Sequence, residues 1–246
     1  MKAAILTDLT QCVGCEACAL ACKEINGLPR TSANNLLTAY TWSAVENRKG
    51  VNIRRQCMHC EEAACVSACP VGALTKTPEG AVIYDGHKCM GCRYCMIACP
   101  FGIPKYQWDK PIPVIEKCIF CYEKALKKGD QPACTRACPT GATLFGERSA
   151  LIAEAQRRME AQPDRYIPHL YGLREAGGTS VLYLSAVPFA DLGFPANMIQ
   201  DPYPKLTWKV LNKIPSIVTT GTALLAGIWW IVNRRIELQD SPEERV

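Results

Sequence analysis

Cysteines dominate the residues of this chain that could do chemistry. The 246-residue sequence contains sixteen of them, in four groups of four with none left over. The groups are Cys12, Cys15, Cys18 and Cys22; Cys57, Cys60, Cys65 and Cys69; Cys89, Cys92, Cys95 and Cys99; and Cys118, Cys121, Cys134 and Cys138. Thiols two residues apart in a tight loop point at a common centre, which is the arrangement that holds an iron–sulfur cluster. The sequence therefore predicts redox cofactors bound by thiolates.

The second and third groups have the most specific spacing. The third runs C-x2-C-x2-C-x3-C-P up to Pro100, and the second also ends in a Cys-Pro step, at Pro70. In bacterial ferredoxins, three thiolates of such a run hold one [4Fe–4S] cluster and the fourth ligates the other cluster. This rule predicts one cluster on Cys57, Cys60, Cys65 and Cys99, and a neighbour on Cys89, Cys92, Cys95 and Cys69.

The first and fourth groups are expected to pair around this central unit. A twelve-residue insertion separates Cys121 from Cys134 in the fourth group, and Lys23 follows the last cysteine of the first group in place of proline. The pattern of residues 140–143 repeats that of residues 71–74, which indicates an internal repeat. The economical assembly has one outer cluster on Cys12, Cys15, Cys18 and Cys138 and another on Cys118, Cys121, Cys134 and Cys22.

The predicted fold class is α+β, with two nested ferredoxin-like modules and one C-terminal transmembrane helix. The four-cluster domain would span residues 1–165, with an outer module made of residues 1–35 and 110–148 and an inner module of residues 51–108. Residues 166–213 would form an extension that packs on partner subunits. Alternating and apolar runs predict strands at residues 3–7, 41–45, 51–53, 73–77, 81–85 and 181–187. Ser149 is the expected N-cap of a helix over residues 150–162.

Other uses of the cysteines fit the pattern less well. A secreted disulfide scaffold would pair thiols with distant partners, and structural zinc usually takes two ligands from each of two knuckles. The formal charge of +5 also changes once clusters are bound, because four clusters with their thiolates bring about −8 and leave the protein near −3. Basic residues are scattered among the cysteine loops, so nucleic-acid binding is not expected.

A membrane-spanning helix is predicted over residues 214–232, which contain no charge. Trp208 and Trp229-Trp230 suit the two membrane–water interfaces. A polar tail is predicted at residues 233–246, and its Arg234-Arg235 pair stops the segment. A buried core helix is the alternative. Thr219, Ala223 and Gly227 form a strip of small residues along one side, which would allow close contact with a helix of a membrane partner.

The four cysteine groups, the segment from Gly177 to Tyr183 and the C-terminal helix together resemble the iron–sulfur subunits of the dimethyl sulfoxide reductase electron-transfer family. The similarity is greatest to the β subunits of quinone-linked formate dehydrogenases and quinone-linked nickel–iron hydrogenases. The resemblance implies four [4Fe–4S] clusters and one-electron transfer with no catalytic residue in this chain. Its partners would be a catalytic subunit of the formate dehydrogenase type or, alternatively, a hydrogenase or another molybdopterin oxidoreductase.

The other partner would be a cytochrome b or polytopic quinone-binding subunit, because the predicted helix has no histidine for a haem. The resemblance also implies a single-pass protein of the cell membrane, with a periplasmic cluster domain and a cytoplasmic tail. Met1 lies only eleven residues before the first ligand, so export bound to a leader-bearing partner is expected. Candidate residues for tuning the clusters lie in or beside the cysteine loops and are His59, Lys88, Arg93 and Lys117.

Overall fold

The structure is a computed structural model that describes residues 2–30 and 36–240. The chain divides into a compact unit up to Pro204 and a helical unit from Lys205 onward. The end of the predicted first outer segment, at residues 31–35, and the end of the predicted tail, at residues 241–246, lie outside the described residues.

A three-stranded sheet is the framework of the compact unit. Its central strand β1 (Ala3–Asp8) pairs antiparallel with β8 (Thr143–Glu147) and parallel with β9 (Val181–Leu184). Ile5 is opposite Phe145 on one side and Val181 on the other. All six residues of β1 are buried, because strands cover both of its edges and side chains pack on both of its faces. The sheet therefore links three segments that are far apart in the sequence.

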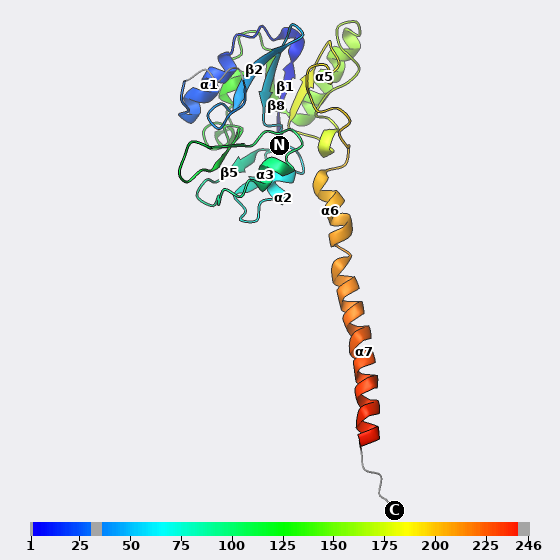
Figure 1. Ribbon diagram of the computed structural model, residues 1–246. Coiled ribbons are helices and arrows are strands. Elements are labelled where there is room, and N and C mark those ends of the chain that lie inside the picture. Colours follow the sequence, from blue (N-terminus) through cyan, green and yellow to red (C-terminus); the bar gives the residue numbers. More distant parts are fainter. Residues whose placement is uncertain (1, 31–35, 241–246) are drawn as a thin grey trace, which may run out of the picture. The chain divides into compact units, whose positions relative to one another are not determined.

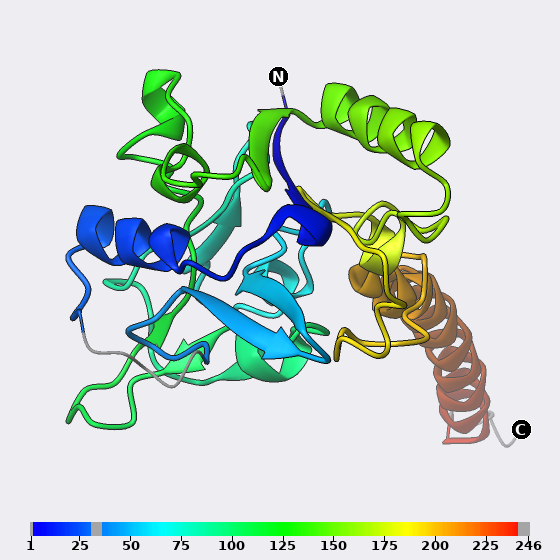
Figure 2. The same cartoon turned by 90° about the horizontal axis from the view of Figure 1, so that it is seen from above.

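The two faces of β1 have different neighbours, since successive side chains of a strand point to opposite sides. Ala4 and Leu6 pack against α5 (Arg148–Ala161), in a cluster that includes Leu151. Ile5 packs on the opposite side with Ile53 and Phe120, which belong to the cysteine-bearing part of the chain. Figures 1 and 2 show α5 and the β2–β3 hairpin on opposite sides of β1.

Helix α5 follows β8 without a linker. Glu147 is its N-cap, and the backbone N–H of Arg148 donates to Lys2 O at 2.8 Å. The expected N-cap at Ser149 is therefore wrong, because Ser149 already lies inside the helix. The direct strand-to-helix connection places α5 over the sheet.

Three hairpins surround the cysteine groups. The first joins β2 (Ser43–Arg48) to β3 (Val51–Gln56) through Lys49 and Gly50, whose positive φ angles of 51° and 79° suit a tight two-residue turn. The other two pair β4 (Leu74–Lys76) with β5 (Val82–Tyr84) and β6 (Lys105–Tyr106) with β7 (Ile115–Glu116). The first two hairpins lie where the sequence predicts strands.

Four helices begin within the cysteine groups. Helix α1 (Ala17–Asn26) packs against α4 (Ala133–Arg136), and α2 (Ala64–Ser67) packs against α3 (Tyr94–Ala98). The first group thus meets the fourth, and the second meets the third. Three short 3₁₀ helices complete this unit: Leu9–Gln11, Leu126–Lys128 and Glu175–Gly177.

The compact unit continues to Pro204, well beyond residue 165, which is the expected end of the cluster domain. Strand β9 supplies the parallel partner of β1, and Tyr183 Oη donates to Arg54 O at 2.8 Å. The first part of the expected extension is therefore integrated into the sheet and core of the unit that carries the cysteines.

Helix α6 (Tyr203–Leu211) begins at the end of the compact unit, and the second unit contains the rest of α6 and α7 (Ile214–Asp240). Within the described residues, 203–239 form one helical stretch long and apolar enough to cross a membrane, with a mean hydropathy of 1.5 in its most apolar part. Large apolar side chains such as Leu225 and Trp229 are exposed on α7, which disfavours the buried core helix. The helix continues past residue 232 and includes the start of the predicted tail.

Candidate iron–sulfur centres

The four cysteine loops share a backbone feature at the residue before the second cysteine. At this position Gly14, His59, Gly91 and Phe120 all have positive φ angles, of 74°, 48°, 71° and 62°. The turn directs a backbone N–H at the first sulfur of the loop: Gly91 N lies 3.4 Å from Cys89 Sγ, and Phe120 N lies 3.4 Å from Cys118 Sγ. Such N–H groups stabilise a thiolate, so the loops of Cys89 and Cys118 favour the anionic form of their first cysteine.

Two small cavities in the compact unit are lined by cysteines of the first and fourth groups. Cys12, Cys15, Cys18 and Cys138 line one of them. Cys22, Cys118, Cys121 and Cys134 line the other. These are the two outer sets expected from the sequence, and in each the fourth thiol comes from the partner group. The packing of α1 on α4 brings them together.

The second and third groups meet in the same way. Cys69, Cys89, Cys92 and Cys95 line a third cavity, between β4, β5 and α3. The remaining four cysteines divide between two neighbouring apolar clusters, with Cys57 and Cys99 in one and Cys60 and Cys65 in the other. The structure thus brings the members of three predicted sets together around cavities, and the fourth set stays a prediction.

Burial disfavours ionisation of the thiols when no metal is bound. Burial and the neighbouring thiols Cys57, Cys99 and Cys65 raise the pKa of Cys60 well above its usual range. Burial likewise raises the pKa of Cys22 to about 12, with contributions from Cys134 and Cys121. Metal binding to such thiols releases protons, and the metal must supply the positive charge that keeps the thiolates together.

The donor chemistry fits clusters better than single metal ions. Zinc–thiolate bonds are about 2.3 Å long, so four thiolates on one zinc would nearly touch. Within residues 2–30 and 36–240, no group of three or more His, Cys, Asp or Glu side chains converges closely enough to hold a single ion. In three sets the four thiols instead line a cavity without converging on one point, as a cubane of iron and sulfide requires.

Buried polar atoms support the same interpretation. Thr7 Oγ1, Arg54 Nη1 and Gln56 Nε2 are buried and have no hydrogen-bond partner among the described residues. Thr7 lines the cavity of Cys12, Gln56 lines the cavity of Cys118, and Arg54 lines both. Unpaired buried polar groups are costly, so their presence at these cavities points to an acceptor supplied by a bound group. Sulfide and thiolate sulfurs of a cluster are such acceptors.

Known proteins are similar to this chain in sequence. Residues 50–148 match the family model described as a 4Fe-4S dicluster domain. The hydrogenase-2 operon protein HybA of Escherichia coli O157:H7 is 40% identical over 78% of this chain and 72% of its own length. The chain belongs to the family of iron–sulfur electron-transfer subunits found in hydrogenase and formate dehydrogenase complexes.

Two further relatives are similar over most of this chain. The formate dehydrogenase-O iron-sulfur subunit of Escherichia coli (strain K12) is 35% identical over 74% of this chain and 66% of its own length. A protein of Nitratidesulfovibrio vulgaris is 39% identical over 94% of this chain and 67% of its own length. The chain thus spans about two thirds of each of these relatives. Members of this family transfer electrons and leave catalysis to another subunit, as the sequence predicts.

Two of the four tuning candidates of this iron–sulfur subunit lie deep inside it. His59 is fully buried, and its Nε2 lies 3.5 Å from Cys118 Sγ. Lys117 is 2% exposed and donates from Nζ to Val82 O and, at 2.8 Å, to Cys118 O. Both therefore lie where a charge or hydrogen bond acts on a cluster ligand.

The other two candidates are exposed. Lys88 Nζ lies 3.8 Å from Asp85 Oδ2. Arg93 lines the cavity of Cys89 and extends over the rings of Tyr106 and Trp108, at 5.3 and 5.4 Å from their centroids. Solvent screens the charge of exposed side chains, so their effect on a cluster is smaller.

One face of β3 contributes to the site although none of its residues was predicted to do so. Asn52, Arg54 and Gln56 alternate along the strand and point at the outer cysteine sets: Asn52 Nδ2 donates to Cys12 O at 3.0 Å, and the other two line the outer cavities. Burial acts to lower the pKa of Arg54, but the thiolates of Cys134 and Cys18 outweigh it and raise this pKa. The sequence signal for this face is the alternation of polar residues in Val51–Gln56, but the same alternation is typical of a strand that faces solvent.

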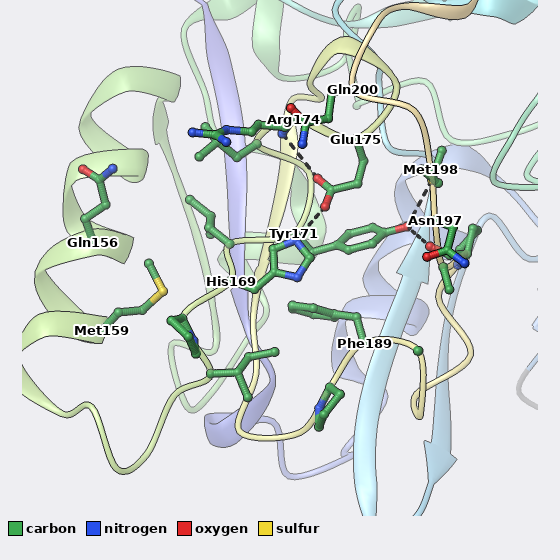
Figure 3. Close-up of a pocket in the computed structure, with 18 residues that line it drawn as sticks. Gln156, Met159, His169, Tyr171, Arg174, Glu175, Phe189, Asn197, Met198 and Gln200 are labelled. Atoms are coloured by element: carbon green, nitrogen blue, oxygen red, sulfur yellow. Dashed lines mark hydrogen bonds and ion pairs between the residues drawn. The ribbon is translucent and has the colours of Figure 1, made fainter.

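A larger cavity of about 650 Å³ lies apart from the cysteines, between α5 and the segments at residues 167–175 and 188–200. Figure 3 shows the ring of Tyr171 at its centre, with the hydroxyl directed toward Met198. Glu175 accepts from Gly172 N at 2.7 Å and pairs with His169 Nε2 at 2.7 Å. No cysteine lines this cavity, so it offers no thiolate for an iron–sulfur cluster.

The strip of small residues lies on α7, in the unit that could cross a membrane. Thr219 Oγ1 donates back to its own helix, to Pro215 O at 2.9 Å and Ser216 O at 3.1 Å. The hydroxyl is thereby satisfied within the helix, which leaves the strip compatible with an apolar environment.

Proposed function

We propose that this chain relays single electrons along four [4Fe–4S] clusters, between a catalytic subunit and a quinone-reactive membrane subunit. The observation that carries the proposal is the gathering of twelve cysteines around three cavities, each lined by four thiols of which one comes from a partner group. The remaining four cysteines would form the fourth set. A bound [4Fe–4S] cluster supplies a one-electron redox centre. The cysteines, the buried donors and the surrounding apolar side chains hold these centres and set their properties.

The four sets would follow one another in a line. Cys18 of the Cys12 set lies in the same apolar cluster as Cys134, and Cys118 lies in one with Cys57. Cys65 lies in a further cluster with Cys95 of the last set. These proximities support the order Cys12 set, Cys118 set, Cys57 set and Cys89 set. The α1–α4 and α2–α3 contacts support nesting of the module formed by the middle two groups inside the outer one.

Burial of the cysteines suits a line with accessible ends. In the Cys118 set, Cys22, Cys118, Cys121 and Cys134 are all buried. At the two ends Cys15 is exposed, and Cys89 and Cys92 are only partly buried. Electrons would therefore enter and leave through the end sets, while the fully buried Cys118 set is shielded from water and from unwanted redox partners.

The membrane side of the proposal depends on α7. Its length and apolar surface support a single membrane span. No histidine occurs in this span, so a haem or quinone site would belong to a cytochrome b or another polytopic partner. We further propose that the cluster domain is periplasmic and the C-terminal end cytoplasmic. An active alkaline phosphatase fused after Val246 would reverse that orientation.

The catalytic partner would be a formate dehydrogenase or a hydrogenase, the two kinds of complex to which the relatives belong. The higher identity to HybA, at 40% against 35% for the formate dehydrogenase-O subunit, supports a hydrogenase partner. Purification of the complex in mild detergent, followed by identification of the subunits and dye reduction with hydrogen or formate, would separate them. Formate-dependent activity without hydrogen-dependent activity would exclude the hydrogenase.

Iron and acid-labile sulfide in the purified complex test the cofactor content. Four clusters correspond to about 16 iron and about 16 sulfide per chain, after subtraction of what the catalytic subunit contributes. Double integration of the EPR signal of the dithionite-reduced protein should give about four spins. Two clusters, or zinc in place of iron with no brown colour, would refute the proposal.

A further inference from the structure

Arg54 is a buried cation without a carboxylate partner. Its residue is 1% exposed, in the middle of β3. Nε donates to Ser43 Oγ at 3.2 Å and Nη2 donates to Gln56 Oε1, whereas Nη1 has no partner among the described residues. Within those residues Arg54 forms no ion pair with Asp or Glu. A guanidinium is charged at every pH at which proteins are folded, so its charge needs a counter-charge.

Arg55, at the next position of the strand, is a partly buried arginine whose charge is paired. Arg55 lies with Nε 3.6 Å from Glu46 Oε2, donates from Nη2 to Leu192 O at 2.6 Å, and stacks over Phe194 with its guanidinium carbon 4.0 Å from the ring centroid. Its charge and its donors are satisfied by protein groups. Arg54, one residue earlier and on the opposite face, has only neutral partners.

The cavities of both outer cysteine sets contain Arg54 in their walls. The same side chain lines the cavity of Cys12, Cys15, Cys18 and Cys138 and the cavity of Cys22, Cys118, Cys121 and Cys134. No other residue lines both of these cavities. A [4Fe–4S]²⁺ cluster with four thiolates carries about −2, so the missing counter-charge would be supplied on both sides once the clusters are bound.

We propose that Arg54 is the shared counter-charge of the two outer clusters and raises the reduction potential of both. This inference rests on the ligand sets proposed above. Addition of one electron makes a cluster with its thiolates more negative, from about −2 to about −3, so a nearby fixed positive charge favours the reduced state. The free Nη1–H groups would donate to cluster sulfur, which acts in the same direction.

A potentiometric EPR titration of the complex tests this role. Arg54→Gln removes the charge and keeps two N–H donors, so both outer clusters should become harder to reduce. We expect at least a tenfold fall in the equilibrium constant for reduction of each, which is about 59 mV for a one-electron couple. The two inner clusters should keep their potentials. Signals of the outer clusters are assigned with Cys15→Ser and Cys121→Ser.

Two further variants separate charge from packing. Arg54→Lys keeps the charge and should keep both outer potentials close to wild type. Arg55→Gln removes an equal charge one residue away and should leave all four potentials unchanged. If Arg54→Gln loses the outer clusters while Arg54→Lys and Arg55→Gln retain them, the charge is needed for cluster retention and the proposal stands.

Three outcomes would overturn the inference: unchanged potentials in Arg54→Gln, a shift in only one outer cluster, or equal damage in Arg54→Gln and Arg54→Lys. The iron and spin count of the wild-type protein is a separate readout. A wild-type protein with fewer than four clusters would contradict the proposed function. Four clusters with potentials insensitive to Arg54 would contradict only the role of this residue.

Discussion

His59 Nε2 lies 3.5 Å from the sulfur of Cys118, although the two residues belong to different cysteine sets. The other ring nitrogen, Nδ1, accepts a hydrogen bond from the backbone N–H of Val82 at 2.9 Å. An acceptor nitrogen carries no proton, so the ring proton must be on Nε2, which then donates to the sulfur. The ring also stacks on Phe120, with centroids 4.5 Å apart. His59 thus connects the loop of Cys57 and Cys60 to a ligand of the neighbouring set.

Replacement of His59 by phenylalanine should therefore act on the Cys118 cluster. His59→Phe keeps an aromatic ring beside Phe120 but removes the donor, and loss of a hydrogen bond to sulfur lowers the reduction potential of a cluster. Potentiometric EPR should show a downward shift in the Cys118 cluster only. The control is His169→Phe, at a half-exposed histidine outside the cysteine sets. A shift confined to the Cys57 cluster would contradict this pairing.

Ligand exchange between groups predicts where damage appears when one cysteine is removed. Cys69 belongs by sequence to the second group, yet it lines the cavity of Cys89, Cys92 and Cys95. Cys69→Ala should perturb the EPR signal of that cluster and spare the cluster of Cys57, Cys60 and Cys65. Cys65→Ala, in the same group, should have the opposite effect. Damage to the same cluster in both variants would refute cross-ligation.

Asp8, the last residue of β1, forms side-chain hydrogen bonds to the segments that pack on this strand. Its buried carboxylate accepts from Tyr166 Oη at 2.7 Å and from Arg158 Nη1 at 3.1 Å. Asp8→Asn should lower the free energy of unfolding by about 2 kcal/mol, because a charged acceptor is lost while its donors remain buried. Tyr166→Phe should cost about 1 kcal/mol.

The two Asp8-network variants can be compared through the rate at which the visible absorbance of the clusters disappears in denaturant. This rate reports kinetic stability, which suits a protein that loses its cofactors on unfolding. Because both variants remove the same hydrogen bond, their double mutant should lose less than the sum of the two. Strict additivity would mean that Asp8 and Tyr166 act independently.

The strip of small residues on α7 predicts a contact with the membrane partner. Gly227→Leu should weaken co-purification of the polytopic subunit without releasing the chain from membranes, because close helix packing depends on small side chains. Gly221→Leu makes the same substitution on the side of the helix opposite Ala223, about 200° away at 100° per residue. It should have little effect.

Truncation after Lys213 extends the test of α7. The clusters and electron transfer from the catalytic partner to an artificial dye should remain, while quinone reduction is lost. Full quinone reduction by both the truncated chain and Gly227→Leu would mean that the helix has no coupling role and serves at most as an anchor.

The cysteine sets could be predicted from the sequence because ligand spacing is local chemistry: Cys89, Cys92 and Cys95 must share a centre whatever surrounds them. The hairpins at residues 43–56 and 74–84 followed from alternation and turn residues in the same way. What could not be predicted depends on contacts across the chain. The parallel pairing of β9 with β1 joins residues about 175 positions apart, as in Ile5 with Val181.

The polar face of β3 shows most clearly why the rest was missed. Asn52, Arg54 and Gln56 have the alternation of a strand with one face in water. Arg54 and Gln56 are nevertheless each 1% exposed, because that face is turned to the cysteine cavities. A sequence pattern gives the face of a strand on which polar residues lie, but not whether water or a charged cofactor lies opposite.

A cryo-EM map of the complex purified in mild detergent is the most direct test of the four-cluster account. The account predicts four cubane densities in one line, with Cys138 bonded to the cluster of Cys12, Cys15 and Cys18, and with Cys22, Cys99 and Cys69 each bonded to a cluster of the partner group. Fewer than four clusters, or a cluster bonded to all four cysteines of a single group, would contradict it.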